Sequence, residues 1–315
     1  MTPSFQTILD AHSRIKAHIH RTPVLSSSIL NSQVGATLFF KCENLQKVGA
    51  FKARGACNAV LSLTDEQARR GVVTHSSGNH GAALAWAARL RGISATVVVP
   101  DNAPAPKKRA IAAYGADIVY CAPNVVAREA SVSALIERHG YFLVHPFDND
   151  QVIAGQGTAT IELLEQCADL DLVISPLGGG GLLSGTAIAA KAMRPLIKVF
   201  GAEPKGADDG YRSFISGKRV TEQTPETICD GLRTTLSERT FNIIRANVDG
   251  IGVASEENVI KAMRLTWELL KIVIESSCSP PLAAILEGNI DVKGKRVGII
   301  LTGGNVDLDK LPWQT

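Results

Sequence analysis

Short apolar runs and amphipathic segments alternate along most of the chain. Apolar runs rich in β-branched residues predict buried strands, and apolar residues spaced three or four positions apart predict helices. Strands are predicted at residues 37–42, 72–75, 95–99, 118–121, 141–144, 172–174, 199–202 and 297–301. Helices are predicted at residues 4–19, from within 43–55 to about 63, and at 79–90, 106–114, 125–138, 152–165, 182–193 and 256–270. Residues 203–252 have a looser pattern, for which no regular element is predicted.

This alternation predicts an α/β fold of right-handed strand–helix–strand units, with mostly parallel sheets covered by helices on both faces. Two blocks can be distinguished. Residues 71–147 would form a small domain, and residues 1–70 together with 148–315 would form a large one. In such folds ligands bind at the carboxyl ends of the strands, often where two domains face each other.

Four consecutive glycines, Gly178 to Gly181, separate the predicted strand at 172–174 from the helix at 182–193. Glycine lets backbone N–H groups approach a ligand closely, and the start of a helix favours an anion. The loop therefore predicts a phosphate site, although a flexible turn has the same composition. It matches neither the dinucleotide fingerprint nor a P-loop. A nicotinamide enzyme stays open, because Glu203 lies near the spacing at which such enzymes bind a ribose.

Polar residues also follow two other predicted strands. Residues 76–80 (SSGNH) could cap a helix or receive a carboxylate, and residues 302–305 (TGGN) read as a glycine turn. Lys52 lies near the start of a helix, where a lysine is usually a surface residue. A partly desolvated lysine can instead form a Schiff base. A phosphate cradle together with an amine nucleophile is what a pyridoxal phosphate enzyme requires.

Glu203 and Asp209 lie six positions apart around a glycine, directly after the strand at 199–202. The pair is either a solvated acidic loop or part of a divalent cation site with oxygen ligands. The seven histidines have no spacing typical of zinc ligands.

The composition is that of a globular protein, since 45% of the 315 residues are hydrophobic, 20% are charged and the net charge is +3. No basic block predicts nucleic-acid binding, and no apolar run is long enough to cross a membrane. The six cysteines are scattered, and no basic and apolar leader is visible. These features predict a cytoplasmic protein with free thiols.

Five motifs together resemble the fold-type II pyridoxal phosphate enzymes, and among them the serine racemase and serine/threonine dehydratase family. They are residues 51–55 (FKARG), 76–81 (SSGNHG), 152–158 (VIAGQGT), 178–181 (GGGG) and 301–305 (LTGGN). The resemblance runs from about residue 20 to residue 307. It implies a large and a small α/β domain with pyridoxal 5'-phosphate (PLP) between them, and a homodimer.

The resemblance also implies roles for individual residues around the cofactor. Lys52 matches the Schiff-base lysine, and Ser77 matches the acid/base on the opposite face of Cα. The other cofactor-binding residues would be Phe51 at the ring, Asn79 at the 3-oxygen, Gly178, Gly179, Gly180 and Gly181 at the phosphate, and Thr302 at the pyridine nitrogen. The substrate carboxylate would be bound by Ser76, Ser77, Asn79 and His80.

Two further sites are implied by the same resemblance. Glu203, the carbonyl of Ala207 and Asp209 match the family's site for Mg²⁺ or Mn²⁺, and Ca²⁺ would suit the same oxygen ligands. A part of the racemase ATP site, where ATP would be an effector, is matched by Ser27, Ser28, Ile29, Lys47 and Tyr114.

The expected activity is a lyase that deaminates serine, threonine or 3-hydroxyaspartate to a 2-oxo acid and ammonia. A serine racemase that uses Lys52 and Ser77 is the alternative, and a β-replacement transferase or a non-catalytic sensor are more distant ones. Phe147-Asp148 and the segment 275–281 (ESSCSPP) depart from the racemase pattern, and Pro-Phe-Asp at 146–148 is more usual in dehydratases. The segment 275–281 together with Ser77 resembles the bacterial 3-hydroxyaspartate dehydratases. Arg128 could bind a second substrate carboxylate, or it could be a solvated arginine on a helix face.

Overall fold

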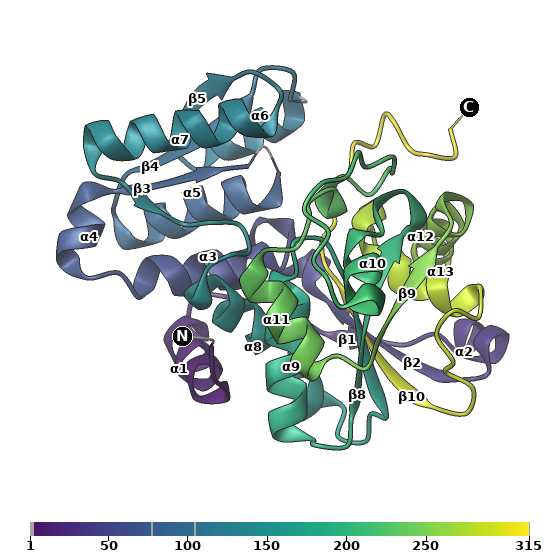
Figure 1. The fold of residues 1–315 in the computed structure, drawn as a ribbon. Helices are drawn as coiled ribbons and strands as arrows, with labels where there is room; N and C mark the ends of the chain where they lie inside the picture. Colours follow the sequence, from purple (N-terminus) through teal and green to yellow (C-terminus); the bar gives the residue numbers. More distant parts are fainter. Residues whose placement is uncertain (1–2, 77, 104, 315) are drawn as a thin grey trace.

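Two sheets of almost entirely parallel strands form the framework of the protein (Figure 1). The structure is a computed structural model that describes residues 3–76, 78–103 and 105–314. The larger sheet contains, in spatial order, β1 (Val24–Leu25), β2 (Thr37–Cys42), β10 (Arg296–Leu301), β7 (Leu172–Pro176), β8 (Lys198–Pro204) and β9 (Gly250–Ala254). The edge strand β1 runs antiparallel to β2, and the other neighbouring strands of this sheet are parallel.

The smaller sheet is parallel throughout. Its strands are, in spatial order, β5 (Asp117–Cys121), β4 (Ala95–Pro100), β3 (Val72–His75) and β6 (Phe142–Leu143). The predicted α/β class with two mostly parallel sheets is therefore confirmed. All four strands fall within residues 71–147, the predicted small domain, whose exact boundaries stay a prediction.

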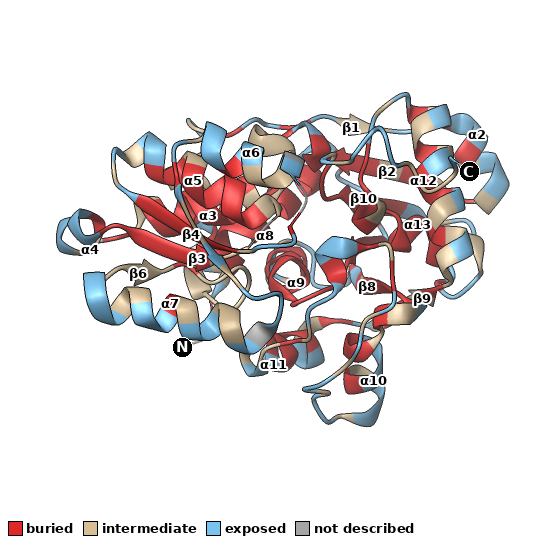
Figure 2. Ribbon diagram, turned by 90° about the horizontal axis from the view of Figure 1, so that it is seen from above, coloured by how far each residue is buried: buried red, intermediate tan, exposed pale blue. Residues whose placement is uncertain are grey.

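Helices cover both faces of each sheet, and Figure 2 shows the buried ribbon between them. The α-helices are α1 (Phe5–Ile15), α2 (Ser28–Val34), α3 (Lys52–Leu61), α4 (Asp65–Arg70), α5 (Asn79–Arg91), α6 (Ala105–Ala113), α7 (Val125–His139), α8 (Asp150–Gln166), α9 (Gly181–Met193), α10 (Asp209–Ser216), α11 (Glu238–Asn247), α12 (Glu256–Leu270) and α13 (Pro280–Leu286). Single 3-10 turns are η1 (Glu43–Leu45), η2 (Lys47–Gly49), η3 (Lys205–Ala207), η4 (Asp230–Leu232) and η5 (Ser276–Cys278).

Side chains on successive strand positions enter different cores, because they point to opposite faces of the sheet. In β7, Leu172 and Ile174 pack with α12 and α13, whereas Val173 packs with α8, α9 and α11. In the smaller sheet, Val97 packs with α3 and α5, and Val98 packs with α7. Burial on both faces explains why the strands read as continuous apolar runs.

The prediction for residues 203–252 is wrong, since α10, α11 and most of β9 lie there. β9 has the sequence GIGVA, and glycine is depleted in strands, so its hydrophobic pattern gave little indication of a strand. The short elements β1, α2, α4 and α13 were also missed.

Among the helices of the described residues, none is both long and apolar enough to cross a membrane. The homodimer stays a prediction.

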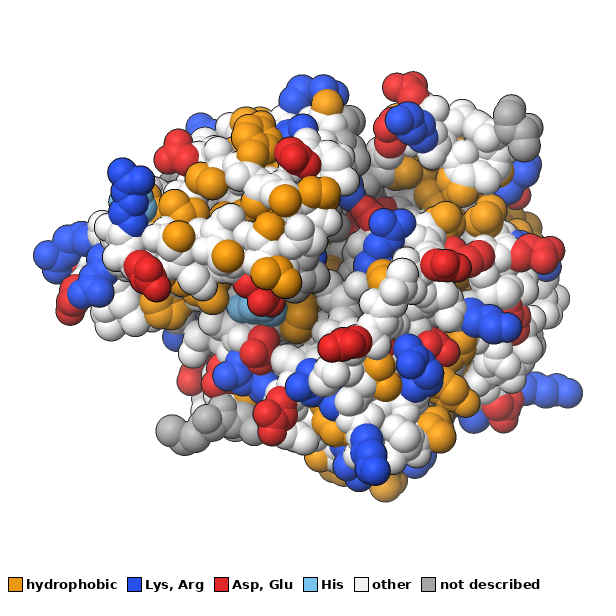
Figure 3. All heavy atoms as spheres, turned by 45° about the horizontal axis from the view of Figure 1, so that its top comes forward, with side chains coloured by type: hydrophobic (Ala, Val, Ile, Leu, Met, Phe, Trp, Pro, Cys, Tyr) orange, Lys and Arg blue, Asp and Glu red, His pale blue; other side chains and the backbone are white. Residues whose placement is uncertain are grey.

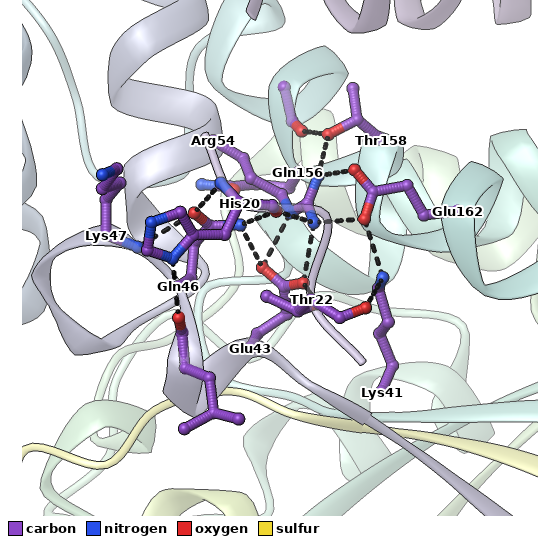
Figure 4. Close-up of polar contacts among 12 residues, drawn as sticks. His20, Thr22, Lys41, Glu43, Gln46, Lys47, Arg54, Gln156, Thr158 and Glu162 are labelled. Atoms are coloured by element: carbon purple, nitrogen blue, oxygen red, sulfur yellow. Dashed lines mark hydrogen bonds and ion pairs between the residues drawn. The ribbon is translucent and has the colours of Figure 1, made fainter. Parts of the chain in front are cut away.

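A buried cluster of charges joins β2, α3 and α8 (Figure 4). The Arg54 guanidinium donates to Glu43 at 2.7 and 2.8 Å and to both oxygens of Glu162 at 2.8 Å. Lys41 Nζ contacts Glu162 at 2.7 Å and the Thr22 carbonyl at 2.8 Å. Burial alone would raise the pKa of Glu162, but Arg54 and Lys41 lower it overall. The two cations and two carboxylates thus balance in a place that water does not reach.

We expect Glu162→Ala to lower the free energy of unfolding by about 3–5 kcal/mol, because Arg54 and Lys41 would keep their buried charges without a shared partner. Urea unfolding followed by circular dichroism would measure the loss. Glu165→Ala is the matched control on the same helix. It removes an exposed ion pair with Arg21, and about 1 kcal/mol or less should be lost. Equal losses in the two variants would contradict this account.

Candidate active site

The predicted site residues lie where strands end and helices begin. Lys52 and Asn79 are the first residues of α3 and α5, Gly181 is the first residue of α9, and Thr302 follows β10. The Phe51 N–H donates to the Thr302 carbonyl at 2.9 Å, and Ala50 forms a β-bridge with Gly303. The loop before α3 is therefore joined to the end of β10. On the face seen in Figure 3, the surface is hollowed between the left-hand lobe and the rest.

The Lys52 amine lies inside the protein, although part of the side chain is open to solvent. Its Nζ donates to the Pro146 carbonyl at 2.8 Å and lies 5.1 Å from the centre of the Phe51 ring. Burial lowers the pKa of Lys52 to about 8, and the negative charge of Glu275 partly opposes this shift. A neutral amine is then accessible near physiological pH, as a nucleophile or a base requires.

The glycine loop makes a backbone cradle at the start of α9. Gly180 has φ +87°, a conformation that favours glycine, and within the described chain no side chain caps this helix. The Phe147 ring lies 2.3 Å from the place that a Cβ on Gly179 would take. The Thr240 hydroxyl donates to the Gly179 carbonyl at 2.9 Å. Among the described residues, the buried Ser184 hydroxyl in the first turn of α9 has no partner.

Asn79 and Thr302 each contact a residue that the sequence reasoning did not assign to the site. Asn79 Nδ2 donates to the two oxygens of Glu275 at 2.8 and 3.1 Å. Cys278 Sγ lies 3.2 Å from Thr302 Oγ1. Glu275 directly follows the apolar pair 273–274, and this position was the one sequence signal that could have placed it in the site. Nothing in the sequence pattern pointed to Cys278.

His80 directly follows Asn79 on α5, and Ser76 precedes Asn79 by three positions. His80 is 2% exposed, and its Nε2 is 3.0 Å from the Val144 carbonyl. Its Nδ1 has no partner among the described residues. Burial, and then the charge of Lys52, hold the pKa of His80 well below its usual range, so the ring is neutral. Ser76 Oγ accepts from the Gly78 N–H at 3.3 Å. Ser77 lies outside the described residues.

Arg128 is half-buried on α7, and its charge acts on His75, the first of a row of rings that leads to the glycine loop. Burial and then the charge of Arg128 lower the pKa of His75. The His75 ring is 5.2 Å from His145, which is 4.6 Å from Phe147 at the glycine loop. The Nε of Arg128 is buried and has no partner in the part of the chain that the structure describes.

The residues present fit a pyridoxal phosphate. The fit rests on a buried amine with a lowered pKa, an uncapped helix start with a glycine cradle, and an unpartnered hydroxyl behind that cradle. An anion would complete the cradle, because the helix start presents N–H groups and a positive dipole end.

Glu203 and Asp209 lie beside each other with no exposed surface. Glu203 is the second-last residue of β8 and accepts from the N–H groups of Gly210 and Tyr211 at 3.2 and 2.7 Å. Asp209 begins α10 and accepts from Gln223 at 2.6 Å. Burial and then Asp209 raise the pKa of Glu203, and burial raises that of Asp209 from 3.8 to about 6. Ala207 is in the turn between them. No group of three or more His, Cys, Asp or Glu side chains forms a metal site within the described residues.

The five residues predicted for a nucleotide come from several elements of the fold. Ser27 caps α2, which begins with Ser28 and Ile29, and α2 lies apart from α6 in Figures 1 and 2. Tyr114 follows α6 and packs in the same apolar cluster as Val48, the neighbour of Lys47. The nucleotide site therefore stays a prediction.

Three comparisons with known proteins agree on the family. The serine racemase of Dictyostelium discoideum is 53% identical over 314 residues, which cover 98% of this chain and 97% of the relative. The beta-hydroxyaspartate dehydratase of Paracoccus denitrificans is 49% identical over 311 residues, 99% of both chains. The solved structure of maize serine racemase has a TM-score of 0.96 and 45% identity, and the match covers 98% of this chain and 95% of the maize chain.

The family described as "Pyridoxal-phosphate dependent enzyme" matches residues 15–303, nearly the whole chain. This match removes the nicotinamide interpretation of the glycine loop. With the fold and the relatives, it shows that the chain belongs to the PLP-dependent fold-type II enzymes, in the group of serine racemases, hydroxyaspartate dehydratases and threonine deaminases.

Proposed function

We propose that this enzyme is an ammonia-lyase that converts 3-hydroxyaspartate to a 2-oxo acid and ammonia by α,β-elimination. The observation that carries the proposal is the buried Nε of Arg128, which has no partner among the described residues. An unsatisfied buried donor is unfavourable, and a second substrate carboxylate would satisfy it. Serine and threonine have no such group. The relationship to the Paracoccus denitrificans dehydratase supports the same substrate class.

Lys52 would hold PLP covalently, and the N–H groups of Gly178 to Gly181 would bind its phosphate. Phe51 would contact the ring, Asn79 would donate to the 3-oxygen, and the Thr302 hydroxyl would meet the pyridine nitrogen. Bound in this way, PLP would supply an electron sink for negative charge at Cα. A hydroxyl stabilises a ring proton less than a carboxylate does, so Lys52 would carry more of the acid/base work.

The protein's own groups account for the remaining steps. Ser76, Asn79 and His80 would orient the substrate carboxylate, and Arg128 would bind the second one. The Lys52 amine would then remove the α-proton, helped by a lowered pKa that keeps part of the amine neutral. Loss of the β-hydroxyl as water and hydrolysis of the resulting enamine give the 2-oxo acid and ammonia.

A serine racemase is the second candidate, supported by the 53% identity to the Dictyostelium discoideum enzyme. It would need Ser77 to return a proton to the opposite face of Cα. Chiral chromatography with L-serine separates the two functions. Faster formation of pyruvate than of D-serine supports the lyase. Faster formation of D-serine than of pyruvate would contradict it.

For the nucleotide, we propose ATP as an effector at Ser27, Ser28, Ile29, Lys47 and Tyr114. An unchanged deamination rate over increasing ATP would remove this proposal.

We expect Lys52→Ala to abolish the visible absorption of the holoenzyme and to lower deamination by roughly 10²–10⁴-fold or more, since the base and the covalent attachment are lost together. Absorption spectra and a coupled 2-oxo acid assay would measure both. Lys261→Ala, an exposed lysine of α12, should leave both unchanged. A coloured and active Lys52→Ala variant would contradict the role of Lys52.

Substrate choice can be tested at Arg128. In Arg128→Ala, we expect kcat/KM for 3-hydroxyaspartate to fall by about 10- to 100-fold relative to serine and threonine, as the loss of one charge-assisted hydrogen bond predicts. Arg138→Ala is the matched control, because Arg138 is exposed on the same helix. Equal losses for all substrates, or none, would remove Arg128 from substrate recognition.

We also propose that Glu203, the Ala207 carbonyl and Asp209 hold one structural divalent cation, with Mg²⁺ the first choice. Without a cation, the raised pKa of Asp209 means that the folded protein binds the proton more tightly, so stability falls as pH rises from about 4 to about 6. Mg²⁺ binds the ionised form. The rise in melting temperature on adding Mg²⁺ to EDTA-treated protein should therefore grow over that range. No effect of EDTA or Mg²⁺ on melting would contradict the site.

A further inference from the structure

The carboxyl group of Glu275 is buried beside Asn79 and has no role in the function proposed above. Glu275 is 7% exposed, and both of its oxygens face Asn79 Nδ2, at 2.8 and 3.1 Å. Its backbone N–H donates to the Gly303 carbonyl at 3.0 Å. A Cβ on Gly303 would lie 2.7 Å from Glu275 Oε1, so the carboxyl group packs closely on the turn after β10.

A chain of hydrogen bonds determines the orientation of the Asn79 amide, that is, which of its oxygen and nitrogen faces Asn305 and which faces Glu275. Asn305 Nδ2 donates to the Val48 carbonyl at 2.8 Å and to Asn79 Oδ1 at 2.9 Å. A carbonyl can only accept, so the Asn305 nitrogen must face Val48 and then donates to Asn79 as well. Asn79 consequently directs its oxygen to Asn305 and its nitrogen to Glu275, and an ionised Glu275 is an acceptor for that nitrogen.

We propose that Glu275 is a positioning residue, which holds the Asn79 amide so that one N–H remains available for a ligand in the cleft. This inference rests on the proposed role of Asn79 at the cofactor. An amide nitrogen has two hydrogens, of which the carboxylate engages one. Without this acceptor, the half-buried Asn79 side chain would lose a charge-assisted bond and the amide could rotate.

The charges around Glu275 make this arrangement sensitive to pH. Burial and then Asp230 of η4 raise the pKa of Glu275 to about 7, whereas the Asn79 hydrogen bond and Lys107 of α6 act in the opposite direction. Lys52 of α3 and Cys278 of η5 also interact with its charge. A protonated carboxyl has one oxygen that donates, so it cannot accept from Asn79 with both oxygens. The hydrogen bond from Asn79 Nδ2 to Glu275 should therefore weaken as pH falls through about 7.

The test is the visible absorption spectrum of the holoenzyme across neutral pH, together with the dissociation constant of PLP. In the wild type, we expect the spectrum to change with a midpoint near pH 7. In Glu275→Gln, that change should be absent and PLP should bind roughly 10-fold more weakly, as for the loss of one hydrogen bond to a charged group. Glu275→Asp keeps a carboxylate and should restore part of both. Glu268→Gln is the matched control, because Glu268 forms an exposed ion pair with Arg264 on α12.

A double-mutant cycle shows whether Glu275 acts through Asn79. If it does, Glu275→Gln should have little further effect on the spectrum or on PLP binding in an Asn79→Ala background. Additive effects would overturn the proposal. So would a wild-type spectrum that is flat through neutral pH, which needs no variant to fold. Failure of the proposed function has a different signature, namely a coloured holoenzyme that does not deaminate hydroxyamino acids.

Discussion

Arg54 donates four hydrogen bonds to Glu43 and Glu162 from a position with no exposed surface. This interaction constrains the whole active site, because α3 packs on α5 of the small block and on α8 of the large one. Lys52 is two residues before Arg54 on α3. An unpartnered guanidinium at this depth is strongly unfavourable, so the helix has little freedom to shift or rotate. The start of α3, which carries Lys52, is thus held in place by charges that lie outside the cleft.

Within the cleft, burial shifts two ionisable groups in opposite directions. It lowers the pKa of Lys52 to about 8 and raises the pKa of Glu275 to about 7, because a low-dielectric environment disfavours the charged form of each. Both groups therefore titrate near neutral pH. Such shifts are expected where a protein exchanges protons with a substrate, and they accompany the backbone cradle of the glycine loop. The arrangement suits a cofactor that carries an anionic group and an amine-reactive carbon.

The sequence by itself determined the fold class, most of the elements and the main site motifs. Parallel strands buried on both faces are rich in apolar and β-branched residues, so β2, β3 and β7 could be read from the pattern even though β2 contains Lys41. The glycine loop could be found from its position between a strand and a helix, whereas the roles expected of Lys52, Asn79 and Thr302 came from the family motifs that contain them. Short elements and the glycine-rich β9 could not, because a few residues carry too little periodic signal.

Only the tertiary structure decided which side chains support that site. Glu275 is 196 positions from Asn79, and Glu162 is 108 positions from Arg54, so no local pattern links either pair. The same applies to Cys278 beside Thr302 and to Gln223, which donates to Asp209. Local periodicity records which residues are buried. It does not record which buried polar groups meet, and that depends on how distant elements pack and on the need to pair each of those groups.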